Sequence, residues 1–404
     1  MKYTLIVILV SVPALLFGQS ISGSWSTASS DGFSGRYGLT SVVVDGKIFA
    51  IAGHTNIGPC NIVEVYDPST DSWNTPTTSG TLTARYELTA SVVDGKIYVC
   101  GGSGSHGATN TLEEFDPVTN TWTTPTTTGN FTKRAWLSSS VFAKKIYVFG
   151  GTAGPYVDAL NTLEVFDPST SIWSTPSTTG TFTPRCGSSS VLIGDKIYVL
   201  GGFTQNNKYV VEIFDPINNL WSTPATNPPF PARMSSAACV IDGKIYLIGG
   251  EDDSGNAVDF FEIFDPSNNT WTSPVITSGA FEARQGLTAE FTGGKIFAMG
   301  GANNSESALI TNQVFIPTPS AVPQRDFSDI SLSPNPATGR FTIGNISSNV
   351  TKVLIMDVLG KTVGEVRNIR TSDISLDLSN LASGTYYVRF ISPNSVITRI
   401  LVKD

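Results

Sequence analysis

The stretch VVDGKIYVCGG, residues 92–102, consists of an apolar run, an Asp-Gly pair, a second apolar run and two glycines. An Asp-Gly pair between two alternating apolar runs is a strong signal for a β-hairpin with a type I′ turn. The stretch recurs as VVVDGKIFAIAG, VFAKKIYVFGG, VLIGDKIYVLGG, VIDGKIYLIGG and FTGGKIFAMGG. Six copies of one hairpin predict a fold built from repeats.

Each copy lies at a fixed distance from an arginine. The arginines recur every 48 to 51 residues, and each precedes the first position of its Gly pair by 16 residues. In five repeats the pair is followed by a glutamate, an aromatic residue two positions later and Asp-Pro, as in EVYDPSTDSW. The pattern alternates with period two, which predicts four short antiparallel strands per repeat. One such sheet cannot bury both of its faces, but a ring of sheets can.

The double glycine, the spaced aromatic residue and the Trp in units of about 50 residues resemble kelch repeats, the blades of a β-propeller. The resemblance covers about residues 22–318. Two departures are informative. Ala52 stands at the first Gly position of repeat one, and repeat six has Gln313 in place of Glu and no following Trp. A Trp in register, Trp25, occurs instead near the N-terminus, so we expect this segment to supply the outer strand of the last blade.

The repeated residues are expected to be structural. Large aromatic side chains suit the packing between blades, and we assign this role to Trp25, Trp73, Trp122, Trp173, Trp221 and Trp271. Buried charges need partners, so we expect partly buried ion pairs with the repeat glutamates for Arg36, Arg85, Arg134, Arg185, Arg233 and Arg284. The Gly pairs are expected to allow crowding near the axis.

The chain starts with MKYTLIVILVSVPALLFGQS, an apolar stretch after one Lys. This pattern is typical of a secretory signal peptide, which we place at residues 1–19. A single membrane anchor is the alternative, but the stretch is short for a span. No later segment is apolar enough, so no membrane span is expected after signal removal.

Charge and cysteine content exclude several classes. The net charge is −8, and residues 327–404 carry eight Lys/Arg against six Asp/Glu, which leaves −10 for the rest. An acidic main body argues against nucleic acid as a partner. The cysteines Cys60, Cys100, Cys186 and Cys239 have no metal-type spacing and no obvious pairing, so buried free thiols are expected. A monomer is expected.

The residues that bind a ligand are expected in one set of loops. Strand order places each arginine and Gly pair at the same end of the ring, so the loop after every Gly pair opens there. These loops vary from 9 to 12 residues, whereas the other intervals are nearly constant. Variable loops on a rigid scaffold usually carry binding. From these loops and the residues just after each arginine, the candidate ligand-binding residues are Tyr37, His54, Tyr86, Glu87, His106, Trp136, Tyr156, Phe203, Glu251 and Gln285.

Two enzyme alternatives stay open on this scaffold. A galactose-oxidase-like copper site uses two His, two Tyr and a Cys, and here His54 and His106 lie in adjacent loops, with Cys60 and Cys186 as the nearest thiols. A sialic-acid mutarotase-like site requires an acid and base pair, such as Glu87 or Glu251, beside an Arg. No catalytic residue, metal or cofactor is assigned. The acidic loop EDDSGN at 251–256 lacks the spacing of a calcium loop and is interpreted as a solvated turn.

The repeats stop at a polar, Pro-bearing linker, residues 319–328. The rest, residues 329–404, alternates apolar and polar residues in about seven short strands, which predicts a small C-terminal β-sandwich. LSPNPATGRF, VLIMDVLGKTV, LDLSNLASGTYYVRF and ITRILVKD resemble the type A C-terminal sorting domain of the type IX secretion system of Bacteroidetes. The terminal Lys403 fits this family, which tends to end in a basic strand. An appended adhesion sandwich is the alternative.

The resemblance implies export across the outer membrane after signal-peptide export, with the type IX secretion machinery as a partner, and subsequent removal of the sorting domain. The predicted protein is therefore an all-β, six-bladed kelch-type β-propeller over residues 20–318, closed by an N-terminal strand and followed by the sorting domain. It is expected to be secreted or held on the cell surface, where one face of the propeller binds a glycan or a protein. A carbohydrate-modifying enzyme is the alternative.

Overall fold

The computed structural model describes residues 21–154, 158–204, 210–230, 232–318, 330–346, 350–357, 362–367, 369, 371, 373–392 and 395–404. The chain forms two compact units, Met1–Pro319 and Ser320–Asp404, and each is considered by itself. Every element among the described residues is a β-strand. The expected signal peptide and linker lie outside these residues.

Five sheets of the first unit have four strands each, hydrogen-bonded in the order in which they occur along the chain. The first sheet contains β2 (Thr40–Val44), β3 (Lys47–Thr55), β4 (Gly58–Asp67) and β5 (Ser72–Asn74), and the second β6 (Thr89–Val93), β7 (Lys96–Cys100), β10 (Leu112–Asp116) and β11 (Thr121–Thr123). The third contains β12 (Ser138–Phe142), β13 (Lys145–Phe149), β14 (Leu163–Asp167) and β15 (Ile172–Ser174), and the fourth β16 (Ser189–Ile193), β17 (Lys196–Leu200), β18 (Val211–Asp215) and β19 (Leu220–Ser222). The fifth contains β20 (Ala237–Ile241), β21 (Lys244–Ile248), β22 (Phe261–Asp265) and β23 (Thr270–Thr272). A two-stranded ribbon, β8 (Ser103–Gly104) and β9 (Gly107–Ala108), extends the second sheet's loop.

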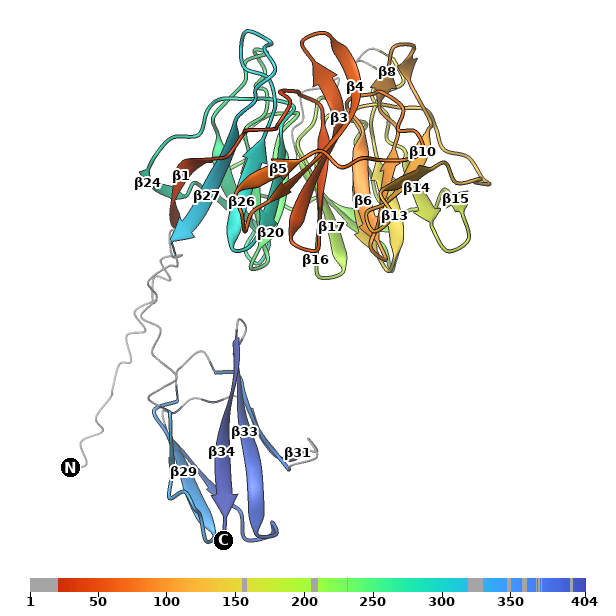
Figure 1. The fold of residues 1–404 in the computed structure, drawn as a ribbon. Coiled ribbons are helices and arrows are strands. Elements are labelled where there is room, and N and C mark those ends of the chain that lie inside the picture. The colour runs from red at the N-terminus through yellow and green to blue at the C-terminus, as the bar shows by residue number, and fades with distance from the viewer. Residues whose placement is uncertain are drawn as a thin grey trace, which may run out of the picture. The chain divides into compact units, whose positions relative to one another are not determined.

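The sixth sheet joins the two ends of the unit. It contains β25 (Thr288–Thr292), β26 (Lys295–Met299), β27 (Asn312–Thr318), β1 (Ser22–Ala28) and β24 (Val275–Ser278). The N-terminal β1 pairs antiparallel with β27 and parallel with β24. Figure 1 shows β1 lying against β27, although nearly 300 residues separate them in the sequence. The N-terminal segment therefore completes the last sheet, as expected.

The six sheets form a closed ring. The first strand of each sheet contacts the first strand of the next, from β2 through β6, β12, β16 and β20 to β25, and β25 contacts β2. The turn between first and second strands has the expected geometry: Asp94 and Gly95 have φ of 51° and 78°, and Asp242 and Gly243 have φ of 49° and 72°. Positive φ at both central positions defines the type I′ turn. The unit is a β-propeller with its first strands around the axis.

Six apolar clusters lie between neighbouring sheets, and each contains one repeat tryptophan. Trp122, for example, packs with residues of the first and second sheets, such as Val63 and Val99. Trp73 is the partly buried member of the set, and its indole N–H donates to the Ser29 carbonyl at 2.8 Å. The tryptophans thus lie between blades.

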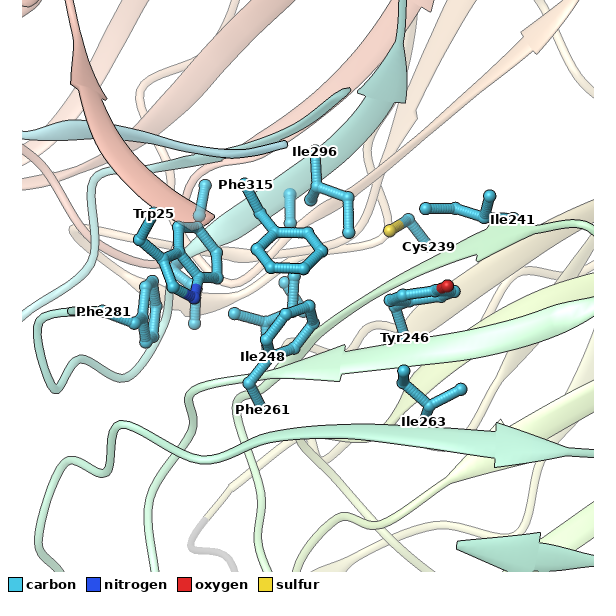
Figure 2. Close-up of a cluster of buried hydrophobic side chains, with 14 residues drawn as sticks. Trp25, Cys239, Ile241, Tyr246, Ile248, Phe261, Ile263, Phe281, Ile296 and Phe315 are labelled. Carbon is cyan, nitrogen blue, oxygen red and sulfur yellow. The ribbon is translucent and has the colours of Figure 1, made fainter. Parts of the chain in front are cut away.

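The cluster at the seam between the fifth and sixth sheets depends on the N-terminal strand. Trp25 is 3% exposed, and its ring centroid lies 5.3 Å from that of Phe261 and 4.7 Å from that of Phe281. Figure 2 shows these rings together with Phe315, whose centroid lies 5.3 Å from that of Trp25. A Cβ at Gly279 would lie 1.9 Å from the Trp25 carbonyl oxygen, so the backbones can approach here only because residue 279 is glycine.

A fully buried arginine clamps each sheet internally. All six repeat arginines are 0% exposed. Five of them pair with the glutamate on the third strand of their own sheet: Arg36 with Glu64 (2.5 Å), Arg85 with Glu113, Arg134 with Glu164, Arg185 with Glu212 (2.7 Å) and Arg233 with Glu262 (2.6 Å). Each glutamate thus joins the loop before the first strand to the third strand.

The clamp of the sixth sheet uses an amide. The Gln313 side-chain oxygen accepts a hydrogen bond from Arg284 at 2.8 Å, and Glu282, whose side chain is 43% exposed, supplies the negative charge at 2.8 Å. Burial, opposed by the charge of Glu282, lowers the pKa of Arg284 to about 10. An amide oxygen can therefore take the glutamate's place when a carboxylate lies nearby.

The second unit consists of two facing sheets. One contains β28 (Ser331–Ser333), β29 (Arg340–Gly344) and β32 (Ile374–Asp377), and the other β31 (Thr362–Arg367), β30 (Lys352–Met356), β33 (Gly384–Ser392) and β34 (Ser395–Lys403). Buried residues from both sheets, including Phe341, Val353 and Leu401, form one core. Ala337 donates to the Val402 carbonyl at 2.8 Å, which ties the segment after β28 to the C-terminal strand. This is the expected β-sandwich.

Replacing Trp25 by Ala should destabilise the propeller by about 3–5 kcal/mol, the usual cost of truncating a buried tryptophan. The change removes the ring that fills the seam between the fifth and sixth sheets. Thermal unfolding of the full chain, followed by tryptophan fluorescence, measures the effect. The exposed Ser26→Ala on the same strand is the matched control, and equal midpoints for the two variants would contradict the role of β1 in closure.

Replacing Glu113 by Ala should destabilise the protein by about 3–5 kcal/mol, because it leaves the guanidinium of Arg85 buried without its partner. Glu113→Gln should cost less, since Gln313 shows that an amide oxygen can accept the hydrogen bond. Chemical denaturation measures both. Glu114→Gln, which removes a surface pair with Lys96, is the control and should cost at most about 1 kcal/mol. Equal losses for Glu113→Ala and Glu114→Gln would refute the clamp.

Candidate functional site

The loops after the Gly pairs open at one end of the propeller, which we call the loop face. In each sheet the second strand runs to the Gly pair, or just past it in β3, and the third strand returns from there, so the loop between them lies at this end. The hairpins between first and second strands and the Asp-Pro turns between third and fourth strands lie at the opposite end, the turn face. The variable loops therefore lie at one common end, as the strand order in the sequence predicted.

Backbone pairing fixes the residues at the base of these loops. In each sheet, the residue after the repeat arginine forms an antiparallel bridge with the residue after the Gly pair. The bridges are Tyr37 with His54, Tyr86 with Ser103, Ala135 with Thr152, Cys186 with Phe203, Met234 with Glu251 and Gln285 with Ala302. The second glycine of each pair also donates to the carbonyl of the next sheet's arginine, as Gly53 does to Arg85 at 2.9 Å and Gly301 to Arg36 at 2.9 Å.

The second residue after each arginine contributes to a closed circle of six hydrogen bonds. Each N–H donates to the carbonyl of the preceding sheet's residue at 2.7–2.9 Å, and Gly38 completes the circle by donating to Gly286. The circle consists of Gly38, Glu87, Trp136, Gly187, Ser235 and Gly286. All six have positive φ, between 52° and 68°. The backbone is thus fixed at the axis, while the side chains at these positions are free to differ.

A cavity of about 350 Å³ lies on the loop-face side of this circle. We call it the axial cavity. It is lined by Tyr37, Tyr86, Glu87, Trp136, Ser235, Glu251, Gly255, Gln285, Gly286, Ala302 and Glu306. These lining residues come from the first, second, third, fifth and sixth repeats. A concave site with aromatic walls and a few convergent polar groups is the usual form of a ligand-binding pocket.

Two tyrosine rings line one side of the axial cavity, and both contact the ring of His54. Tyr37 stacks on His54 with ring centroids 4.9 Å apart, and Tyr86 meets His54 edge to face at 4.9 Å. The two tyrosine rings are 6.4 Å apart. The Nδ1 atom of His54 is buried without a hydrogen-bond partner. His54 therefore supports the tyrosines from behind rather than lining the cavity itself.

Glu87 is the most perturbed group in the axial cavity. Burial, with the charge of Glu251 as a second cause, raises the pKa of Glu87 to about 8. Its Oε1 atom is buried and accepts no hydrogen bond. A Cβ on Gly38 would lie 2.5 Å from this oxygen, so the carboxyl group occupies space that the glycine leaves open. Burial and the nearby Asp252 and Glu306 also raise the pKa of Glu251.

The structure brings six of the ten predicted ligand-binding residues together in the axial cavity: Tyr37, Tyr86, Glu87, Trp136, Glu251 and Gln285. His54 lies directly behind them. His106 is exposed in the turn between β8 and β9, and Phe203 pairs with Cys186 outside the described cavity lining. Tyr156 lies outside the described residues.

Sequence reasoning missed Ser235 and Glu306. Ser235 occupies the second position after its arginine, as Glu87 and Trp136 do, so the repeat register alone could have identified it. Glu306 lies in the loop between β26 and β27 with φ of 56°. No repeat register marks that position, because the loop conformation brings it to the axis.

A second cavity of about 500 Å³ runs along the axis between the first strands. It is rich in hydroxyl groups that bond across neighbouring sheets, as in Thr89 with Ser139 at 2.6 Å and Ser140 with Ser190 at 3.1 Å. A smaller cavity of about 80 Å³ lies at the circle of hydrogen bonds and shares residues with both larger ones. The smallest cavity thus lies between the axial cavity and the second cavity, at the level of the circle.

The thiols and acidic groups do not form a metal centre among the described residues, where no three metal-ligating side chains cluster. Cys60 is half-buried and Cys186 fully buried, and burial raises the pKa of the Cys186 thiol to about 12. In the acidic loop, the Asp252 carboxylate accepts N–H bonds from Ser254 and Asn256, both at 2.9 Å. Of the described residues lining the axial cavity, none is the Arg that the mutarotase alternative requires.

The comparisons with known proteins match both units. The family described as the KLHDC2/KLHL20/DRC7 Kelch-repeats domain matches residues 15–202 and 187–340. The secretion system C-terminal sorting domain matches residues 331–404. No curated protein matches the chain. Within the described part of the chain, no helix is long and apolar enough to cross a bilayer.

The sorting domain indicates export by the type IX secretion system, to the cell surface or into the medium. Kelch repeats form interaction domains, so the chain is a secreted interaction module. The repeats, the closed ring of six sheets and the match over most of the chain agree: the chain belongs to the kelch-repeat family and carries a C-terminal secretion system sorting domain.

Proposed function

We propose that this propeller binds a glycan or a protein through its loop face, with the axial cavity as the centre of the binding site. The observation that carries the proposal is the convergence of three aromatic and three carboxylate side chains, from five repeats, in one cavity of about 350 Å³. The rest of the ring is regular, so the diversity of side chains at this point serves binding rather than the fold.

The side chains of the cavity suit a ligand that packs on aromatic rings and donates hydrogen bonds. Tyr37, Tyr86 and Trp136 offer flat apolar faces, on which a sugar ring or a peptide side chain can pack. Gln285 and the carboxylates offer hydrogen-bond acceptors. The circle of hydrogen bonds fixes the backbone of Glu87 and Trp136, and backbone bridges fix that of Tyr37, Tyr86, Glu251 and Gln285, before any ligand arrives. A preorganised site loses less entropy on binding.

Replacing Trp136 or Tyr86 by Ala should weaken ligand binding by at least about tenfold, because each removes a large face from the centre of the site. Binding is measured on a glycan array and against a displayed peptide library, with the full chain as probe. Val118→Ala is the control: Val118 is 89% exposed in the turn between β10 and β11, on the turn face.

A ligand whose affinity is unchanged by Trp136→Ala and Tyr86→Ala, while thermal midpoints also stay the same, would place binding elsewhere on the molecule. Absence of any binding to glycans or peptides would remove the proposal. Chemical turnover of a bound sugar would instead favour the carbohydrate-modifying alternative.

Deletion of residues 327–404 should leave the propeller in the periplasm, because the sorting domain carries the export signal. Cell fractionation followed by immunoblotting of an epitope placed before the linker measures the result. We also propose that the sorting domain is removed after export, so the exported form should be shorter than the full chain. Normal release without residues 327–404 would contradict the sorting role.

A further inference from the structure

The charged side chains that line the axial cavity all have one sign. Glu87, Glu251 and Glu306 are carboxylates, and no described residue of the lining is Lys or Arg. The repeat arginines are fully buried in the clamps of their own sheets. Among the described residues of the lining, the negative charge therefore has no cationic partner.

The lack of a partner is clearest at the Glu87 carboxyl group. Its side chain reaches from the second sheet toward the first and sixth, since a Cβ on Gly38 or Gly286 would lie 2.5 Å or 3.8 Å from its Oε1 atom. That oxygen is buried and lacks a hydrogen-bond donor. A buried carboxyl group without a partner is costly, so it binds a proton or a cation when one is available.

The aromatic wall favours the same kind of ligand. Tyr37 and Tyr86 meet edge to face and share the cavity with Trp136. Aromatic faces attract ammonium and guanidinium groups, and the attraction is strongest where water is partly excluded. Rings and carboxylates around one cavity therefore favour a cationic group over a neutral one.

The rim of the loop face indicates what carries the cation. Ile57 and Ile310 are 99% and 57% exposed, in the loops of the first and sixth sheets, and Phe260 is 45% exposed in the loop of the fifth. The first and sixth loops touch each other, because the Asn56 side-chain oxygen accepts the Ala308 N–H at 3.0 Å. Exposed apolar side chains at the tips of adjoining loops offer a surface that a polypeptide partner can cover.

We propose that the axial cavity recognises a Lys or Arg side chain of a polypeptide partner, whose neighbouring apolar residues contact the rim at Ile57 and Ile310. This inference rests on the proposed function, because it names the partner of that same site. The cationic group enters between the tyrosine rings and the three carboxylates, and supplies the donors that Glu87 lacks.

Selection from a displayed peptide library against the full chain tests the proposal. The selected peptides should carry Lys or Arg at a constant position, next to apolar residues. The double variant Glu251→Gln, Glu306→Gln should weaken their binding by about tenfold or more, and so should replacing the peptide's Lys by acetyl-lysine. Asp253→Asn, in the same loop as Glu251 but outside the cavity lining, is the matched control and should have little effect.

The pH dependence provides a readout that a structural role would not produce. Burial raises the pKa of Glu87 to about 8, so the carboxyl gains its charge as the pH rises through that value. Binding of a Lys peptide should therefore tighten between pH 6.5 and 9, and Glu87→Gln should flatten the profile. The other titratable groups facing this site are Tyr37, whose pKa is raised by burial, Tyr86, Cys186, with a thiol pKa of about 12, Glu251, Glu306 and the adjacent His54.

The outcomes separate this inference from the proposed function. Peptides that lack a cationic residue, or whose binding is unchanged by the double variant, refute the cationic partner, although the proposed function stands if Trp136→Ala still abolishes their binding. If the protein binds glycans but no peptides, the cationic partner is likewise refuted and the proposed function stands. If neither peptides nor glycans bind, or if Trp136→Ala has no effect on binding, the proposed function itself fails.

Discussion

The closure of the ring is the constraint on which the rest of the structure depends. Each sheet buries a face only against its neighbours, so the apolar clusters between sheets form completely when the sixth sheet meets the first. Closure in turn requires β1, from the other end of the unit, to lie between β24 and β27. The same closure completes the circle of hydrogen bonds at the axis, where Gly38 donates to Gly286. A site built on that circle exists only in the closed ring.

Some residue positions must be the same in every sheet of the ring, whereas others can differ between sheets. The arginine clamps use buried polar groups, and the carbonyl of each arginine also receives the N–H of the preceding sheet's glycine. Each arginine therefore bonds within its own sheet and also with the preceding sheet. Two residues after each arginine the backbone has a positive φ close to the axis, and Gly38, Glu87 and Trp136 all fit this same backbone conformation. Local variation there changes the chemistry of the cavity without changing the ring.

Much of this could be predicted from the sequence, because the determining signals are periodic. The hairpins, the arginine register and the displaced Trp25 indicated a closed ring of six sheets, and the loop face followed from strand order. Positions tied to the register, such as Tyr86 and Glu87, were correctly placed near the axis. Glu306 was not identified, because its position depends on a loop conformation that no repeat determines. Phe203 follows its Gly pair in register but does not line the axial cavity. The orphan oxygen of Glu87 depends on the absence of a side chain at Gly38, a contact between separate repeats that the sequence of either one cannot indicate.

The pairing of Ser22 with Thr318 places both ends of the propeller at the same corner of its last sheet, at the turn face. The chain leaves through β27, which is flanked by β26 on one side and β1 on the other. A pull on the C-terminal end therefore loads β27 along its length, and the hydrogen bonds to both neighbours, which lie across that direction, share the force. Shear of this kind is harder to overcome than peeling a strand from an open edge. The sheet that closes the ring is thus also suited to carry mechanical tension. A propeller held at that corner has its loop face at the end opposite to the point where it is held.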